Sequence, residues 1–203
     1  KMARLGMVID LYRCVGCNGC TMACKAENGT PRGIYLTRVL EKEVGKYPYA
    51  KKEFIPVACF HCEDAPCVRA CPTGATSKRE DGIVTVDDDI CIGCRACYVA
   101  CPYNNRFYLS KGLLQKGYFG ELSPYERVKY KDFTEGTVVK CTLCAHRLEK
   151  GLEPACVITC PTEARVFGDL DDPTSKVNEL IREKSGFQML PEANTNPSVY
   201  YLK

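Results

Sequence analysis

Cysteine is the residue type that organises this chain, with 16 cysteines in 203 residues. They fall into four sets, and each set begins with CxxC and ends with a cysteine four positions after its third. Cysteines at such spacings bind metal or form disulfides. Sets one to four are, in order, Cys14, Cys17, Cys20, Cys24; Cys59, Cys62, Cys67, Cys71; Cys91, Cys94, Cys97, Cys101; and Cys141, Cys144, Cys156, Cys160.

Sets one and three read CxxCxxCxxxC, a spacing typical of bacterial-type iron–sulfur ferredoxins. Gaps of two residues let successive sulfurs point to one centre while the intervening amides turn toward it. The gaps hold small residues that allow such a turn, namely Gly16, Gly19, Gly93 and Ala96. The spacing therefore predicts four [4Fe–4S] clusters as the cofactors.

Two other interpretations of the cysteines fit less well. Disulfide frameworks concentrate in secreted chains shorter than about 100 residues, and dense CxxC sets are poorly spaced for crosslinks. Structural zinc joins two CxxC pairs across a longer finger, which sets two and four could imitate but sets one and three could not. A zinc-bound adaptor would also be colourless.

The sets are internally repeated. Residues 9–24 match residues 86–101 at an offset of 77, with all four cysteines, Gly16 and Gly93, and Asp10 and Asp87 aligned. Residues 67–75 match residues 156–164 at an offset of 89. Set one thus resembles set three and set two resembles set four, which predicts one two-cluster ferredoxin module inserted in another.

In such modules the fourth cysteine of a run ligates the other cluster. The opening run CVGCNGCTMAC is therefore expected to serve two clusters, with Cys24 in the second. The expected ligands are Cys14, Cys17, Cys20 and Cys160 for cluster 1; Cys141, Cys144, Cys156 and Cys24 for cluster 2; Cys59, Cys62, Cys67 and Cys101 for cluster 3; and Cys91, Cys94, Cys97 and Cys71 for cluster 4.

The predicted fold is α+β, built from these two modules with a C-terminal extension. Residues 1–50 and 141–170 form the outer module and residues 51–102 the inner one. Residues 103–140 are an aromatic and basic insertion, which suits a subunit interface, with a loop that packs on its own module as the alternative. Residues 171–203 are predicted as a helix, capped by Asp172 before Pro173, and an extended tail with a strand at 199–201.

Beyond the cysteines, the chain resembles the four-cluster iron–sulfur subunits of molybdopterin oxidoreductases of the dimethyl sulfoxide reductase superfamily. The resemblance spans nearly the whole chain and is closest to polysulfide, thiosulfate, sulfur, tetrathionate and respiratory arsenate reductases. It is carried by CVGC near the N-terminus, HCEDAPCV around His61, CPTGA, CPTEA, KCTLCAHRLEKG at 140–151 and GDLDDP at 168–173.

The resemblance implies an electron-transfer subunit in anaerobic respiration. Electrons would pass between a catalytic subunit that holds molybdenum or tungsten and a membrane quinone-linked subunit or other carrier. No dinucleotide loop, nucleophile–base pair or spare cysteine stands out, so we expect no catalytic site in this chain. A free soluble polyferredoxin is the alternative function.

Charge and hydropathy limit the partners and the location. The formal charge is +3, but four clusters with a net charge of −2 each bring it to about −5, which argues against nucleic acid. Lys25, Arg69, Arg95 and Lys140 adjoin cysteines and are candidates for tuning cluster potentials. His61 and His146 are expected to be structural, not ligands.

No apolar run approaches the roughly 18 residues of a membrane span. The N-terminal KMARLGMVIDL has no signal-peptide core. The expected location is peripheral to the cytoplasmic membrane, on its outer face after export with a signal-bearing partner, with the cytoplasmic face as the alternative.

Overall fold

The computed structural model describes residues 3–203, so residues 1 and 2 of the expected outer module lie outside the described part. The strands are β1 (Leu5–Asp10), β2 (Thr37–Val44), β3 (Lys51–Ala58), β4 (Thr76–Lys78), β5 (Val84–Val86), β6 (Phe107–Tyr108), β7 (Val138–Val139), β8 (Arg165–Asp169) and β9 (Val199–Leu202). The helices are α1 (Gly19–Asn28), α2 (Pro66–Arg69), α3 (Ala96–Ala100), α4 (Pro124–Lys129), α5 (Ala145–Leu148), α6 (Ala155–Ile158) and α7 (Lys176–Glu183), with 3-10 turns η1 (Tyr130–Asp132) and η2 (Pro191–Ala193). This mixture of short helices and strands is the expected α+β class.

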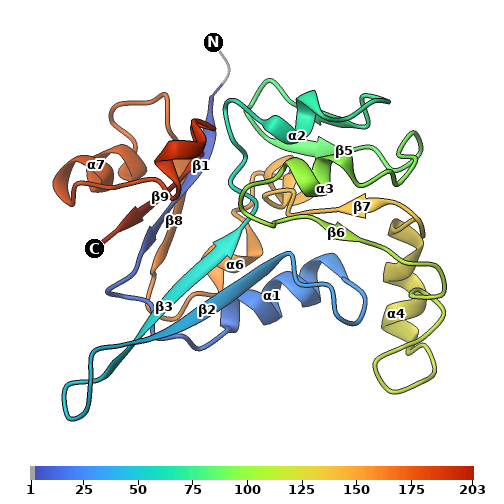
Figure 1. Ribbon diagram of the computed structural model, residues 1–203, viewed down its shortest axis with the longest axis horizontal. Helices are drawn as coiled ribbons and strands as arrows, with labels where there is room; N and C mark the ends of the chain where they lie inside the picture. Colours follow the sequence, from blue (N-terminus) through green and yellow to red (C-terminus); the bar gives the residue numbers. More distant parts are fainter. Residues whose placement is uncertain (1–2) are drawn as a thin grey trace.

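One three-stranded sheet joins the beginning and the end of the chain. Its order is β8-β1-β9, with β1 antiparallel to β8 and parallel to β9. The predicted strand at 199–201 is therefore confirmed as β9. In Figure 1 this sheet and α7 form the left part of the molecule, while α2, α3, β6 and β7 lie to the right.

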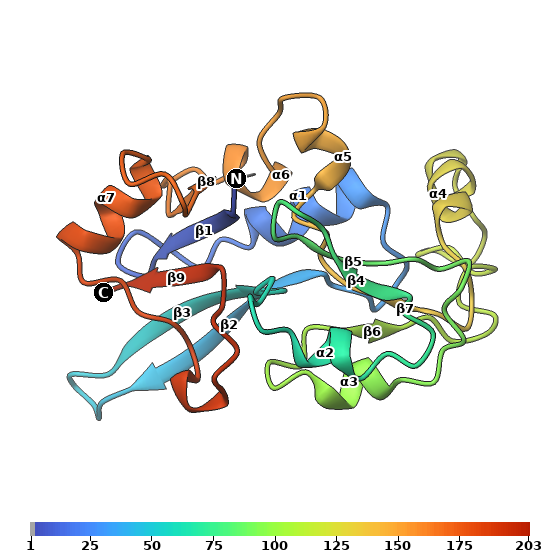
Figure 2. The same ribbon diagram turned by 90° about the horizontal axis from the view of Figure 1, so that it is seen from above.

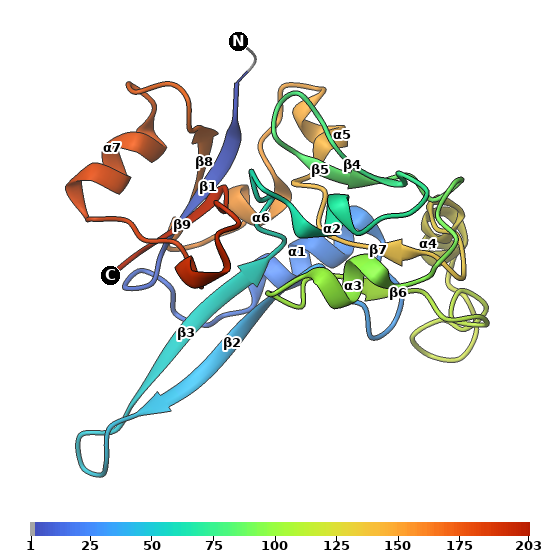
Figure 3. The ribbon, with the colours of Figure 1, turned by 45° about the horizontal axis from the view of Figure 1, so that its top comes forward.

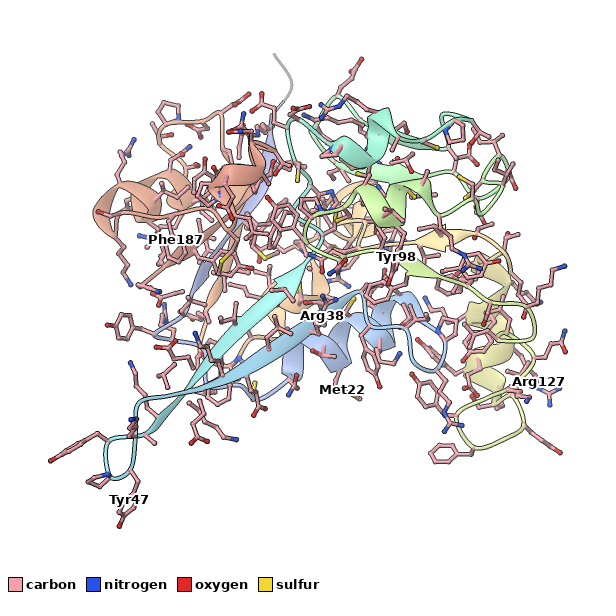
Figure 4. All side chains as sticks on the ribbon, in the orientation of Figure 1. Met22, Arg38, Tyr47, Tyr98, Arg127 and Phe187 are labelled. Carbon is pink, nitrogen blue, oxygen red and sulfur yellow. The ribbon has the colours of Figure 1, made fainter. Side chains whose placement is uncertain are left out.

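A long hairpin of β2 and β3 projects from the body of the molecule (Figure 3). Its pairing runs from Thr37 opposite Ala58 to Val44 opposite Lys51. Tyr47 lies at its tip and is 94% exposed (Figure 4). The expected module boundary between residues 50 and 51 falls at the end of this turn, so the hairpin pairs β3 of the expected inner module with β2 of the expected outer module.

Helix α7 begins later than the sequence predicted. Its N-cap is Ser175, because the Asp172 carboxylate instead accepts hydrogen bonds from the amide and hydroxyl of Thr174, at 2.8 and 2.7 Å. This turn places the helix start at Lys176. Val177 on the apolar face of the helix is fully buried against the sheet.

Thiols take part in the buried core together with hydrocarbon side chains. Cys20, Cys62 and Cys156 belong to the same buried cluster as Ile9 and Ile83. This cluster joins residues of both expected modules. Helices α2 and α3 pack against each other in the right part (Figure 2).

Candidate iron–sulfur sites

Sets one and three fold into the same kind of loop. Gly16 and Gly93 have φ values of 69° and 63°, and the residue before each following helix, Asn18 or Arg95, is also left-handed. A Cβ at Gly16 would clash with the Phe54 ring, and one at Gly93 would clash with the Gly136 carbonyl. Glycine is therefore required at both positions, for conformation and for space.

The four cysteines expected for cluster 1 line one cavity. Cys14, Cys17 and Cys20 come from the loop and first turn of α1, and Cys160 follows α6. Helices α1 and α6 pack together, which brings the two ends of the chain to this point. Burial raises the pKa of Cys14, and the nearby Cys20 and Cys160 thiols add to that rise.

The cysteines expected for cluster 2 line a second cavity. Cys24, in the middle of α1, faces Cys141, Cys144 and Cys156 there, and Cys59 of set two also reaches the cavity. Burial strongly raises the pKa of Cys24, with further contributions from the other three thiols. Cys24 thus lies away from the first three cysteines of its own run.

The cysteines expected for cluster 3 also converge. Burial, together with the neighbouring Cys59, Cys67 and Cys101, raises the pKa of Cys62 to about 12. Cys101 comes from set three, so this group again joins two sets.

The two sets that supply the cysteines expected for cluster 4 are linked by a pair of packed helices. Cys97 lies in α3, which follows Cys91 and Cys94, and α2 ends just before Cys71. Since α2 and α3 contact each other, the two sets meet here as well.

The last cysteines of sets two and four have matching surroundings. Cys71 Sγ accepts the Thr76 amide and Cys160 Sγ accepts the Ala164 amide, both at 3.3 Å. Burial opposes ionisation, but hydrogen bonds from Thr76 and Thr73 lower the pKa of Cys71 to about 7. The pKa of Cys160 is lowered in the same way. Thiolates are the form that binds metal, so both positions are prepared for ligation.

Buried polar atoms support cluster binding at these cysteines. His61 is 1% exposed, and its Nδ1 accepts the Val84 amide at 3.1 Å, which leaves the proton on Nε2. Neither His61 Nε2 nor Arg106 Nη2 has a hydrogen-bond partner within residues 3–203. Two buried donors beside Cys62 and Cys67 suit an anionic sulfur cluster, whose sulfurs accept hydrogen bonds.

Zinc and a cubane cluster place different demands on the spacing of thiols. In the described part of the chain, no three Cys, His, Asp or Glu side chains are placed to hold a single metal ion. Zinc draws its sulfurs to about 2.3 Å from one centre. A cubane cluster holds its ligands at separate corners and so spreads the thiols more widely.

The four bases beside cysteines differ in their surroundings. Arg69 is exposed and pairs with Asp64, and Arg95 is exposed over the Tyr108 ring. Lys25 is half-buried, and its Nζ donates to the Ile34 carbonyl at 2.8 Å. Lys140 is buried, so it has the surroundings expected of a base that tunes potentials.

Two buried arginines were not predicted from the sequence as residues of the cluster sites. Arg165 and Arg106 are 3% and 1% exposed. Arg165 Nη1 points to Cys156 Sγ at 3.8 Å. Burial would lower the pKa of Arg106, but the nearby Cys67 thiolate raises it. Each arginine follows the last cysteine of its set by five residues, and that spacing is the signal that could have found them.

His146 lies at the surface and pairs through Nε2 with Glu27 Oε1 at 2.9 Å. In the insertion, Tyr130 is buried and Tyr125 donates to the Ala26 carbonyl, while Phe119 is fully exposed. The insertion therefore packs partly on its own chain and leaves one aromatic side chain free. No helix within residues 3–203 is long and apolar enough to cross a membrane.

Comparison with known proteins defines the class. A family model described as a 4Fe-4S dicluster domain matches residues 50–119 and 115–170, and a second model with the same description matches residues 13–75. The chain is thus an iron–sulfur protein with two ferredoxin-like dicluster domains and four [4Fe–4S] clusters.

Relatives match almost the whole chain. The arsenate respiratory reductase iron-sulfur subunit of Shewanella sp. (strain ANA-3) is 44% identical over 98% of this chain and 96% of its own length. A selenate reductase subunit of Mesobacillus selenatarsenatis is 44% identical over 97% and 70% of the two chains. A tetrathionate reductase subunit of Salmonella typhimurium is 39% identical over 98% and 72%. The chain belongs to the family of four-cluster iron–sulfur electron-transfer subunits of molybdopterin oxidoreductases.

Proposed function

We propose that this chain conducts single electrons through four clusters, numbered 1 to 4 in order, between a molybdopterin catalytic subunit and a second electron carrier. The observation that carries this proposal is the cavity in which Cys24 of set one meets Cys141, Cys144 and Cys156 of set four. It supports the ligand groups predicted from the sequence. Together these groups use all sixteen cysteines.

The inserted arrangement of the modules is supported by one repeated hydrogen bond. The Asp10 amide donates to the Ala164 carbonyl at 2.8 Å, which links sets one and four. The Asp87 amide donates to the Ala75 carbonyl, also at 2.8 Å, which links sets three and two. These are the positions that the two internal repeats align. We therefore assign sets one and four to the outer module and sets two and three to the inner module.

The order of the clusters follows from the contact between the modules. Cys59, a ligand proposed for cluster 3, reaches the cavity of cluster 2 and contributes to raising the pKa of Cys141 after burial. Clusters 2 and 3 therefore meet at the module junction. Clusters 1 and 4 lie at the two ends of the path.

Both ends are open to partners. Of the sixteen cysteines, all within the described residues, Cys17 and Cys94 alone are exposed, and they belong to clusters 1 and 4. Beside Cys17, Met22 projects from α1 away from the body of the molecule (Figure 4). Val99 is exposed at the aligned position of α3. An exposed cysteine with an apolar neighbour suits docking of a redox partner at each end.

The three relatives described above are named for reduction of arsenate, selenate and tetrathionate. We propose that the catalytic partner likewise acts on an oxyanion, and that this chain has no substrate turnover of its own. A membrane quinone-linked subunit is the proposed second carrier.

The complex would lie at the outer face of the cytoplasmic membrane, and protection of this chain from protease in spheroplasts would contradict that location.

Anaerobic purification from the native host tests the function. The complex should contain about sixteen irons for this chain in addition to any in the partner, with stoichiometric molybdenum or tungsten. Sixteen irons without either metal, and without a copurifying large subunit, would instead favour the free polyferredoxin. Zinc in place of iron would refute both.

A further inference from the structure

Three basic side chains are buried in the described part of the chain, and all three lie among the cysteines. Of the Lys and Arg residues within 3–203, Arg165, Lys140 and Arg106 alone are buried, at 3%, 3% and 1% exposure. A buried charge is costly unless a counter-charge or hydrogen bonds compensate it. None of the three forms an ion pair with a carboxylate in residues 3–203.

Arg165 lies between the ligands of clusters 1 and 2. Its Nη1 is 3.8 Å from Cys156 Sγ, while its Nη2 donates to Thr37 Oγ1 at 3.1 Å. Burial alone would lower the pKa of Arg165, but the Cys156 and Cys20 thiolates raise it. Cys156 belongs to cluster 2 and Cys20 to cluster 1, and Arg165 lines both of the cavities that contain them.

Lys140 lies between clusters 2 and 3, at the module junction. Its Nζ donates to the Cys141 carbonyl at 2.6 Å and to the Val84 carbonyl of the inner module. Burial raises the pKa of Cys141 and of Cys67, and Lys140 opposes the rise at both. Cys141 belongs to cluster 2 and Cys67 to cluster 3.

Arg106 lies between clusters 3 and 4. Burial would lower its pKa, but the Cys67 and Cys97 thiolates raise it. Its Nη1 donates to Thr76 Oγ1 at 3.1 Å, and Thr76 in turn hydrogen-bonds to Cys71 of cluster 4. Arg106 lies in the insertion, directly after the inner module, and donates to a threonine hydroxyl as Arg165 does, although the two arginines follow different cysteine sets.

We propose that Arg165, Lys140 and Arg106 are buried cations, one in each gap between successive clusters. Each raises the reduction potentials of the two clusters on either side of it. This inference rests on the proposed ligand groups and cluster order. Reduction adds one electron to a site already of charge −2 and changes no bond or proton. A fixed cation near the thiolates, as Arg165 is at 3.8 Å from Cys156 Sγ, therefore favours the reduced form. The same charge weakens the repulsion between two neighbouring reduced clusters.

The test is an anaerobic redox titration of the purified complex, followed by low-temperature electron paramagnetic resonance. Arg165→Gln, Lys140→Met and Arg106→Gln each remove one charge while keeping much of the side-chain volume. At a fixed applied potential, each variant should lower the reduced-to-oxidised ratio of two clusters about tenfold. This ratio corresponds to a reduction potential lowered by about 59 mV for one electron. The other two clusters should keep their potentials.

The pattern of overlap distinguishes the proposal from a general loss of structure. Arg165→Gln and Lys140→Met should share one affected cluster, Lys140→Met and Arg106→Gln should share another, and the two arginine variants should share none. Arg69→Gln is the matched control, since Arg69 is close to Cys67 and Cys71 in the sequence but is exposed and pairs with Asp64. It should change every ratio by less than about twofold, because solvent screens its charge.

Unchanged potentials in variants that retain about sixteen irons would overturn the inference and leave the proposed function intact. If the variants show the predicted overlap of affected clusters but the chain copurifies with no molybdenum or tungsten subunit, the inference stands and the proposed function is wrong. If a glutamine variant loses iron, Arg165→Lys and Arg106→Lys decide the matter because they keep the charge. Wild-type reduced-to-oxidised ratios in these lysine variants support the inference. Ratios lowered about tenfold, as in the glutamine variants, contradict it.

Discussion

Cys24 and Cys144 line the same cavity, although they come from cysteine sets at opposite ends of the chain. The thiol of Cys144 is among the groups that, after burial, raise the pKa of Cys24. Asn28 Nδ2 also donates to Cys24 Sγ at 3.4 Å, which holds the thiol in position on α1. This relationship makes the proposed crossing of ligands testable without assigning any spectrum to a particular cluster.

Paired cysteine substitutions should report cluster membership through iron content. Cys24→Ala, Cys17→Ala and Cys144→Ala should each cost one cluster and leave about twelve irons. Cys24→Ala with Cys144→Ala should still leave about twelve, because both residues serve cluster 2. Cys24→Ala with Cys17→Ala should leave about eight. If the values for the two double variants are interchanged, Cys24 belongs with its own run and the proposed pairing is wrong.

Gly93→Ala should remove cluster 4 from the folded chain. A Cβ there meets the Gly136 carbonyl, and φ is 63°, so the loop that carries Cys91 and Cys94 would have to move. Gly33→Ala is the matched control, because Gly33 has φ of 81° but nothing within 4 Å of a Cβ. Iron analysis should give about twelve irons for the first variant and about sixteen for the second. Equal iron contents would show that the loop tolerates the side chain.

The four [4Fe–4S] clusters could be predicted because thiolate spacing is a local property of the sequence. The loops at Gly16 and Gly93 follow from two-residue gaps, and the internal repeats anticipate the equivalent hydrogen bonds of Asp10 and Asp87. The strand at 199–201 was also predictable, since Val199, Tyr200 and Tyr201 are residue types that favour strands.

Contacts between distant segments could not be predicted from the sequence. Arg165 and Arg106 look like ordinary surface bases until folding places them beside cysteines of two sets. The pairing of β9 beside β1 depends on the path of the C-terminal tail, which no local pattern specifies. The start of α7 was misplaced because two capping residues, Asp172 and Ser175, compete within four positions, and Asp172 closes a turn instead.

Protonation of Glu126 should loosen the insertion. The Glu126 carboxylate accepts the Ser123 and Tyr118 amides at 2.7 and 2.9 Å, and hydrogen bonds from Ser123 and Tyr118 lower its pKa to about 2. Since the folded pKa lies below the ordinary glutamate value of 4.5, this stabilisation is complete above about pH 4.5 and is lost as the pH falls toward 2. Glu126→Gln imitates the acid form at neutral pH.

Amide hydrogen exchange measures that loosening. In Glu126→Gln the Tyr118 and Ser123 amides should exchange about 2- to 30-fold faster, as expected for a lost helix cap worth roughly 0.5–2 kcal/mol. Glu121→Gln serves as the control, because Glu121 is an exposed carboxylate of the same insertion. Equal exchange rates in the two variants would show that the carboxylate does not hold this segment.

Tyr201→Phe should weaken the attachment of the C-terminal tail. Tyr201 is fully buried, and its hydroxyl donates to the Pro56 carbonyl of β3 at 2.8 Å, which ties β9 to the projecting hairpin. Removing one partner of a buried hydrogen bond costs about 1–2 kcal/mol. Tyr200→Phe is the control, because the Tyr200 hydroxyl has no hydrogen bond within residues 3–203. Under anaerobic urea unfolding, the cluster absorbance of Tyr201→Phe should disappear at a lower urea concentration than in Tyr200→Phe or the wild type. Coincident curves for the two variants would mean that the Tyr201 ring anchors the tail by packing and that its hydroxyl adds nothing.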